Sequence, residues 1–264
     1  MKWEELTARD FPGAVRKAKG LCVVPLGCIE KHGEHLPLGT DLYQVRAIAE
    51  AAARIEPFAI FPPYFFTQIH CAKHQPGTIA IRSRLMIDLI ENVCEEIARN
   101  GFSRIILLNG HGGNEDWLPF FNWMMTYEKQ TDYAVYLARL GDFWSDEKTP
   151  KFKKMKQTDV DGHAGEKETS VMLALHSNLV KMKYLPKKGA RPLGRTKHLP
   201  LFAPISWYAN FPGHYAGDGT TGTRKKGEIA MEEMTRNLVK IAKAVKNDTV
   251  ALKLQNEFSR KIQH

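Results

Sequence analysis

Short apolar runs alternate along this chain with segments of helical periodicity. The runs Leu21–Leu26 and Arg104–Leu108 show no polar alternation, which is typical of strands buried on both faces of a parallel sheet. Between them, Leu85–Ala98 places its apolar residues on one stripe of a helix, and Ser83 just ahead is a candidate N-cap. Such alternation predicts an α/β chain with a parallel sheet and helices on both faces.

Weaker signals extend this pattern over the rest of the chain. The further expected elements are helices at Gln44–Arg54, Trp117–Lys129, Glu166–Leu179 and Gly227–Lys246, and strands at Phe58–Phe61 and Ala134–Leu140. The segment Tyr184–Gly222 is rich in Pro, Gly and aromatic residues without periodicity, so we expect ordered loops there. Because no repeat or linker divides the sequence, we expect one domain over residues 1–264.

The net charge of +9, from 38 Lys and Arg against 29 Asp and Glu, raises the question of nucleic-acid binding. The basic stretches are local and lack interleaved stacking aromatics; they are Lys151–Lys156, Lys181–Lys188 and Arg224–Lys226. A nucleic-acid module would combine the two features. We therefore expect a solvated basic surface and no nucleic-acid partner.

Membrane insertion and a disulfide framework are not expected either. No apolar run approaches the roughly 18–20 residues that a membrane span needs. The first residues include acidic side chains and no apolar signal segment, so we expect a cytoplasmic protein. The four cysteines form no C-x-x-C pair and are interpreted as reduced thiols, buried in part; they are Cys22, Cys28, Cys71 and Cys94.

Ionisable side chains cluster directly after the first apolar run. Glu30 and His32 follow it in a segment expected to be extended, where residues two apart point to the same side. Asp41 stands at the start of the next predicted helix, after a turn that contains Pro and Gly. Two carboxylates and an imidazole at this spacing suit zinc or manganese, although a polar loop without metal would use the same residues.

A second polar segment, Asn109–Asn114 (NGHGGN), follows the apolar run Arg104–Leu108. Its glycines permit tight turns and close backbone approach around His111. The segment taken alone is equally well interpreted as a Gly-rich turn that caps a helix, or as the site of a metal-binding histidine.

A third polar segment, Asp161–Ser170, opens a predicted helix. His163 lies just ahead of that helix, and Glu166 and Glu168 lie in its first turn, where negative charge is favoured without any ligand. A common metal site explains all three segments together, because ligands gather at the carboxyl ends of the strands in such sheets.

On these residues the chain resembles the creatininase (creatinine amidohydrolase) family. The matching stretches are Pro25–Asp41, Asn109–Asn114 and His163–Ser170, with a weaker match at Pro76–Thr78. The resemblance implies a three-layer α/β/α sandwich with a mainly parallel central sheet. It also implies two divalent metal ions per chain and a homo-oligomer, a hexamer in the family.

The resemblance also assigns ligands, namely Glu30 and His111 to one metal, His32 to the other and Asp41 to a bridge. In the creatinine-hydrolysing members a glutamate ligand lies two residues after the matching histidine, where this chain has Gly113. We expect Glu168 to replace it, with Glu166 as the alternative.

The three segments and the resemblance predict a metal-dependent amidohydrolase. Two metals, zinc with manganese as the alternative, would activate a water that attacks the C–N bond of a small-molecule amide, cyclic amide or formamide. The predicted catalytic residues are His163, which would protonate the leaving nitrogen, and Glu168. Creatinine is not singled out, because Gly112 replaces a tyrosine of the creatinine hydrolases and Trp144 is only a candidate for their substrate-covering tryptophans. The alternatives are a catalytically degenerate binding protein and a precursor-peptide peptidase of the same family.

Overall fold

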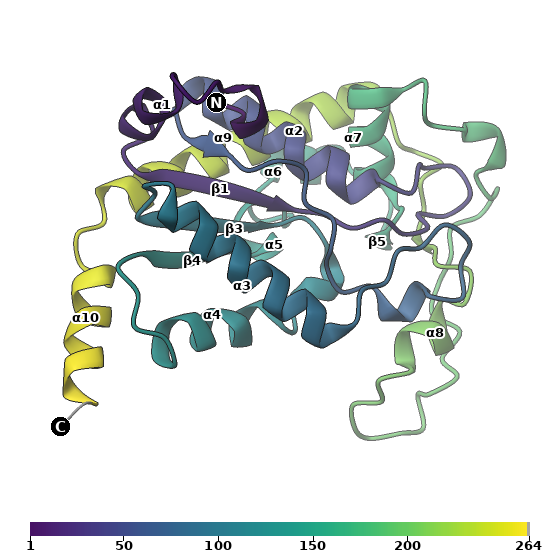
Figure 1. Cartoon of the computed structure of the whole chain (residues 1–264). Helices are drawn as coiled ribbons and strands as arrows, with labels where there is room; N and C mark the ends of the chain where they lie inside the picture. The colour runs from purple at the N-terminus through teal and green to yellow at the C-terminus, as the bar shows by residue number, and fades with distance from the viewer. Residues whose placement is uncertain (263–264) are drawn as a thin grey trace.

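The computed structural model describes residues 1–262 and has a parallel four-stranded sheet at its centre (Figure 1). The strands, in spatial order, are β2 (Ala59–Ile60), β1 (Leu21–Leu26), β3 (Arg104–Asn109) and β4 (Ala134–Ala138). All three strand pairs are parallel. The predicted parallel sheet is therefore confirmed, and each of the four strands lies within the range expected from the sequence or one residue beyond it.

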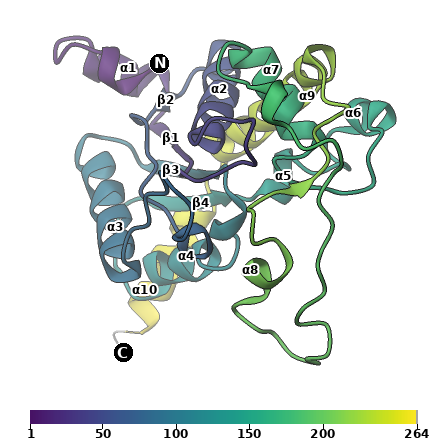
Figure 2. The same ribbon diagram turned by 90° about the vertical axis from the view of Figure 1, so that its right-hand side faces the viewer.

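Helices cover both faces of this sheet. The main covering helices are α2 (Thr40–Ile55) and α9 (Arg224–Asn247) on one face, and α3 (Ser83–Arg99) and α4 (Leu118–Tyr127) on the other. Because successive strand residues point to opposite faces, Leu21 and Val23 of β1 pack in the first core while Cys22 and Val24 pack in the second. Figure 2 shows the resulting three layers, which confirm the α/β/α sandwich.

Shorter elements complete the described chain. They are α1 (Phe11–Lys17), α5 (Leu140–Phe143), α6 (Pro150–Met155), α7 (Glu166–His176), α8 (Ser206–Asn210), α10 (Ala251–Lys261) and the antiparallel pair β5 (Asp161–His163) and β6 (Ala216–Gly217). Most of these are too short to show a period in sequence. Helix α10 escaped prediction for another reason: its most buried residues are the polar Gln255 and Ser259. None of the helices over residues 1–262 is both long and apolar enough to span a bilayer.

Several predicted boundaries were wrong at helix ends. Ser83 makes no capping bond, because the helix already includes it and Arg82 is the N-cap residue. Helix α7 ends at His176 rather than at Leu179, because the chain continues in tight turns, with the Leu179 N–H donating to the carbonyl oxygen of His176. The segment Tyr184–Gly222, expected as loops, contains α8 and β6 and projects from the sheet (Figure 1).

The strand order places a ligand crevice between β1 and β3. The chain runs from β1 outward to β2 and then crosses to β3 on the other side of β1, so the order reverses between β1 and β3. Open α/β sheets bind ligands at such a reversal, outside the carboxyl ends of the strands. Leu26 pairs with Asn109, so the two strands end level with each other. Gly27 allows α2 to approach, since a Cβ there would lie 2.5 Å from Leu42 Cα.

Candidate metal centre

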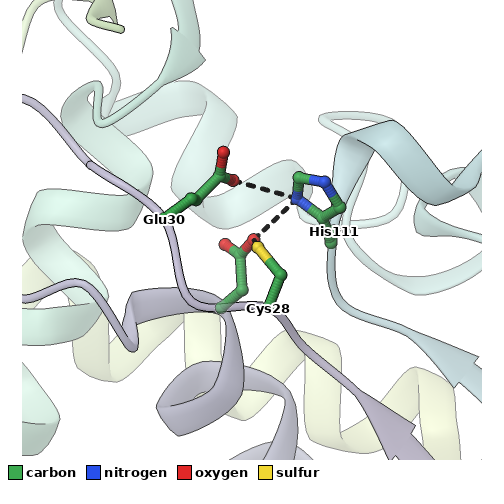
Figure 3. A group of neighbouring side chains, drawn as sticks. Cys28, Glu30 and His111 are labelled. Carbon is green, nitrogen blue, oxygen red and sulfur yellow. Dashed lines mark hydrogen bonds and ion pairs between the residues drawn. The ribbon is translucent and has the colours of Figure 1, made fainter. Parts of the chain in front are cut away.

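Asp41 lies at the centre of a buried cluster beyond these strand ends. Its Oδ1 lies 2.9 Å from His32 Nε2, and its Oδ2 lies 2.8 Å from His111 Nδ1. Glu30 Oε1 lies 3.0 Å from the same His111 nitrogen, and Figure 3 shows Glu30 and His111 facing each other from separate segments. Asp41 therefore presents one oxygen to each of two histidines, a geometry compatible with a bridge between two cations.

Glu168, in the first turn of α7, extends the cluster on the His32 side. Its Oε2 lies 3.9 Å from His32 Nε2 and accepts a hydrogen bond of 2.6 Å from the backbone N–H of Ala164. His32, His163 and Glu168 have ligand atoms that all lie within 4.8 Å of one another. The structure thus brings Glu168 beside His32 and His163 at one side of the cluster.

Glu166, the alternative ligand, points away from this cluster. It is fully buried, and its carboxylate forms an ion pair of 2.5 Å with Lys226 and accepts hydrogen bonds from the backbone N–H and the hydroxyl of Thr158. Residues two apart on a helix do not face each other, so only one of the two α7 glutamates can reach His32.

The charges of the cluster fit a cation. Within residues 1–262, Glu30, Asp41 and Glu168 form ion pairs only with histidines and with no Lys or Arg. His32 Nδ1 donates to the carbonyl oxygen of Glu30 at 3.2 Å, and Nε2 faces the carboxylates of Asp41 at 2.9 Å and Glu168 at 3.9 Å. A histidine that donates one ring N–H to a carbonyl while the other nitrogen faces carboxylates is typical of a metal ligand.

The donor atoms of the cluster lead to the same conclusion. Ligand atoms of Cys28, Glu30, Asp41 and His111 all lie within 4.8 Å of one another, and all four side chains are buried. Carboxylate and imidazole donors together suit zinc or manganese, so these side chains fit the predicted metals.

Without a metal, protons on the histidines balance the carboxylates. Burial disfavours charge on His32, but the adjacent Asp41 outweighs it and raises the pKa of His32 to about 10. Burial acts against ionised Asp41 too, yet His32 and His111 lower its pKa to about 2. Burial and the Asp41 charge raise the pKa of Glu168 to about 7. These shifts describe a tightly coupled charge cluster in which a cation can replace protons.

His163 differs from the other histidines because it is neutral. Burial, reinforced by the charge of His32, lowers its pKa to about 3. Its Nε2 lies 2.8 Å from the carbonyl oxygen of Lys31, which can only accept, so Nε2 carries the proton and Nδ1 carries the lone pair. The ring lies beside His32, with the centroids 4.2 Å apart. His163 is therefore placed to accept a proton before it can donate one.

The NGHGGN turn holds His111 through its asparagines. Asn109 Oδ1 accepts from the backbone N–H of His111 at 3.1 Å and from Asn114 Nδ2 at 3.1 Å. A Cβ on Gly113 would lie 2.6 Å from His111 Nε2 and 2.7 Å from Gln68 Oε1. A side chain at position 113 would therefore require His111 or Gln68 to move.

Three neighbours of the cluster were not predicted as metal ligands or catalytic residues. His214 Nε2 lies 2.6 Å from Glu30 Oε2, and Trp207 contacts the His163 ring with the centroids 5.8 Å apart. Both come from the segment Tyr184–Gly222, which carries aromatic residues but no motif. The Cys28 thiol donates to Asp41 Oδ2 at 3.2 Å, and burial raises its pKa well above the usual range.

Other sequence candidates lie outside the cluster or support it indirectly. Trp144 packs against the hydrophobic core and contributes its carbonyl oxygen to Lys167. His35 Nε2 bonds to Thr169 Oγ1 at 2.8 Å and so joins the loop after β1 to α7. Glu34 is exposed and pairs with Lys31.

Comparison with known proteins agrees with this geometry. The creatininase family (creatinine amidohydrolase) matches residues 4–242. The chain belongs to the creatininase family. A creatinine amidohydrolase of Pseudomonas putida is 24% identical over 250 residues, which cover 86% of this chain and 90% of that protein. A mycofactocin precursor peptide peptidase of Mycolicibacterium smegmatis is 28% identical over 222 residues, 81% of each chain. The predicted family and a metal-binding hydrolase function are thereby confirmed.

Solved structures share the fold. The crystal structure of a creatinine amidohydrolase (creatininase) superposes with a TM-score of 0.78 at 21% identity and covers 94% of this chain and 98% of that chain. Two further creatininase structures, one of Zn–Zn type and one described as Mn, each give a TM-score of 0.76 at 21% and 20% identity, over 94% of this chain and 98–99% of theirs. The α/β/α architecture is thus that of the creatininases.

Proposed function

We propose that this creatininase-family hydrolase is a binuclear amidohydrolase that cleaves the C–N bond of a small-molecule amide. The observation that supports it most is Asp41, whose two oxygens face His32 and His111 separately. Glu30 and His111 would hold one divalent ion, His32 and Glu168 the other, and Asp41 both. We propose zinc as the native metal, with manganese as the alternative. When bound, the metals supply Lewis acidity that polarises a carbonyl group and lowers the pKa of water.

His163 would move the proton of the reaction. Its neutral ring has Nε2–H fixed on the carbonyl oxygen of Lys31, which leaves Nδ1 to take a proton as water attacks the amide carbon. The same nitrogen would then deliver that proton to the leaving nitrogen. Burial and the nearby His32 disfavour a charged imidazolium at His163, so the ring gives up the proton readily. Glu168, with a pKa raised to about 7, would assist as the second catalytic residue.

A small substrate is favoured over an extended peptide. Glu30, Asp41, His111 and His163 are all buried. Trp207 meets the His163 ring edge to face and packs against Phe211 with the ring centroids 5.2 Å apart, so aromatic rings from Tyr184–Gly222 lie beside the cluster. A buried centre with an aromatic wall suits a compact amide, such as a cyclic amide or formamide. Both named relatives, an amidohydrolase and a peptidase, act on amide bonds by name.

The test compares substitutions of two glutamates in the same segment, Glu30 and Glu34. Purified protein is stripped with a chelator, reloaded with zinc or manganese, and assayed on cyclic amides, N-formyl compounds and short peptides. We expect metal-dependent hydrolysis of a small amide, loss of at least 100-fold in kcat/KM for Glu30→Gln, and little change for the exposed control Glu34→Gln. Hydrolysis that survives full metal removal, or preferential cleavage of peptides, would overturn the proposal.

A further inference from the structure

Trp207, His214 and Glu30 form a hydrogen-bonded chain that ends in the metal centre. The indole Nε1–H of Trp207 donates to His214 Nδ1 at 3.0 Å, and His214 Nε2 lies 2.6 Å from Glu30 Oε2. His214 and Glu30 are each 1% exposed, so neither can exchange its partner for bulk water. These hydrogen bonds join α8, in the late segment Tyr184–Gly222, to the loop that follows β1.

The donor and the acceptor of each of these two hydrogen bonds follow from the chemistry of the groups. An indole N–H can only donate, so Nδ1 of His214 must accept. A neutral imidazole carries one proton, which therefore resides on Nε2 and is donated to Glu30 Oε2. Ligand atoms of Glu30, His163 and His214 lie within 4.8 Å of one another and could by distance hold a third ion. Nδ1 of His214 already accepts from Trp207 and Nε2 carries a proton, so neither nitrogen has a free lone pair for such an ion and His214 is not a ligand.

The same hydrogen bond makes the two oxygens of Glu30 unequal. Oε2 accepts from His214, whereas Oε1 forms an ion pair of 3.0 Å with His111 Nδ1. The carboxylate is thus held in one orientation, with Oε1 inside the cluster of Asp41 and His111.

The backbone around His214 is also held in place. His214 has φ of +53°, a conformation that residues other than glycine rarely adopt and that persists only when the surroundings impose it. Its carbonyl oxygen accepts from the N–H of Gly33, and His74 and Gln75 bind the carbonyl oxygen of Pro212. Next to His214, the late segment is therefore bonded both to Gly33, in the loop after β1, and to His74 and Gln75.

We propose that Trp207 and His214 are positioning residues for the metal ligand Glu30: Trp207 fixes the tautomer of His214, and His214 orients Glu30 so that Oε1 faces the metal. This inference rests on the proposed metal centre. Groups that orient a metal ligand typically contribute 10–100-fold to metal affinity. The aromatic late segment thereby influences how strongly the centre holds its metal, as well as covering it.

Two substitutions of His214 separate orientation from packing. Glutamine keeps a donor for Glu30 and an acceptor for Trp207, whereas leucine fills similar space and has neither. Zinc affinity is measured by competition with a chelating dye, with circular dichroism to confirm folding. We expect His214→Leu to weaken zinc binding 10–100-fold and His214→Gln to stay within roughly fivefold of the wild type. A folded His214→Leu protein with unchanged affinity, or a folded His214→Gln protein as weak as His214→Leu, would overturn the inference.

The tautomer itself is measured on metal-free protein labelled with ¹⁵N-histidine. Two-bond ¹H–¹⁵N spectra should show His214 protonated at Nε2 in the wild type, and Trp207→Phe should lose this fixed pattern while its ring still packs on His163. A wild-type His214 protonated at Nδ1 would contradict the inference. Because this readout needs no metal, it stands apart from the proposed function, which would instead fail if the wild type bound no zinc or manganese.

Discussion

Two regions of this protein build one site in different ways. The loops that follow β1 and β3 deliver Glu30, His32 and His111 from the level ends of paired strands, so the sheet itself fixes their positions. The late segment Tyr184–Gly222 delivers Trp207 and His214 from α8 and the loop after it, with hydrogen bonds to His74, Gln75 and Glu30. The proposed ligands Glu30, His32 and His111 thus lie at the edge of the sheet, while the groups proposed to orient and cover them come from a segment outside the sheet.

Asp41→Ala should have the largest effect on this arrangement. Within residues 1–262, Asp41 is the one carboxylate that pairs with both His32 and His111, so its loss leaves the two halves of the cluster without a shared anion. We expect the variant to lose both metals and its activity together, as measured by elemental mass spectrometry and by kcat/KM. Retention of two metals by a folded Asp41→Ala protein would show that Asp41 does not bridge.

Glu168→Gln should have an intermediate effect, because Glu168 comes from α7 and reaches only the His32 side. Calorimetric titration with zinc should resolve a tight event that is kept and a second event weakened about 10–100-fold. If both events weakened equally, Glu168 would contribute to the cluster as a whole rather than to one metal.

Glu166→Gln should instead reduce stability and leave metal binding intact, because Glu166 pairs with the buried Lys226 away from the cluster. Removing one partner of such a pair costs about 3 kcal/mol, measured by urea unfolding. The exposed pair Arg224–Glu228 at the start of the same helix α9 provides the control, Glu228→Gln, for which little change is expected.

The cost of Glu166→Gln should depend on pH. Burial acts to raise the pKa of Glu166, but the bonds from Lys226 and Thr158 lower it overall. A lowered folded pKa means that the stabilisation is complete above the unfolded pKa of about 4.5 and is lost as the pH falls through the lower value. Wild type and variant should therefore differ most near neutral pH and converge in acid. A difference that grew on acidification would contradict the assignment.

Cys28→Ser should have the smallest effect. The Cys28 thiol is held protonated by burial and donates to Asp41, a role that a hydroxyl can take over. We expect unchanged metal content and zinc affinity. With cobalt in place of zinc, no thiolate-to-metal charge-transfer band should be present in the wild type, and a strong band lost in Cys28→Ser would make Cys28 a ligand.

The same contrast explains what the sequence could predict. Buried runs such as Leu21–Leu26 and Arg104–Leu108 predict strands, and the fold confirmed both strands. The polar residues placed directly after them predict a site at the sheet edge, and the structure brings Glu30 and His111 together there. The contribution of His214 could not be predicted, because its contact with Glu30 depends on tertiary packing across 184 residues of sequence. The assignment between Glu166 and Glu168 also required the structure, since both are equally suited to a helix N-terminus.

The ligand roles assigned to Glu30, His32, Asp41, His111 and Glu168, and the catalytic role assigned to His163, remain predictions. The most direct test is the number of divalent ions per chain in protein purified without chelator, counted by native and elemental mass spectrometry and repeated after reloading with zinc or manganese. The account predicts two ions. A saturating value of one would contradict the binuclear centre and the role of Glu168, and no uptake of either metal would contradict the metal centre altogether.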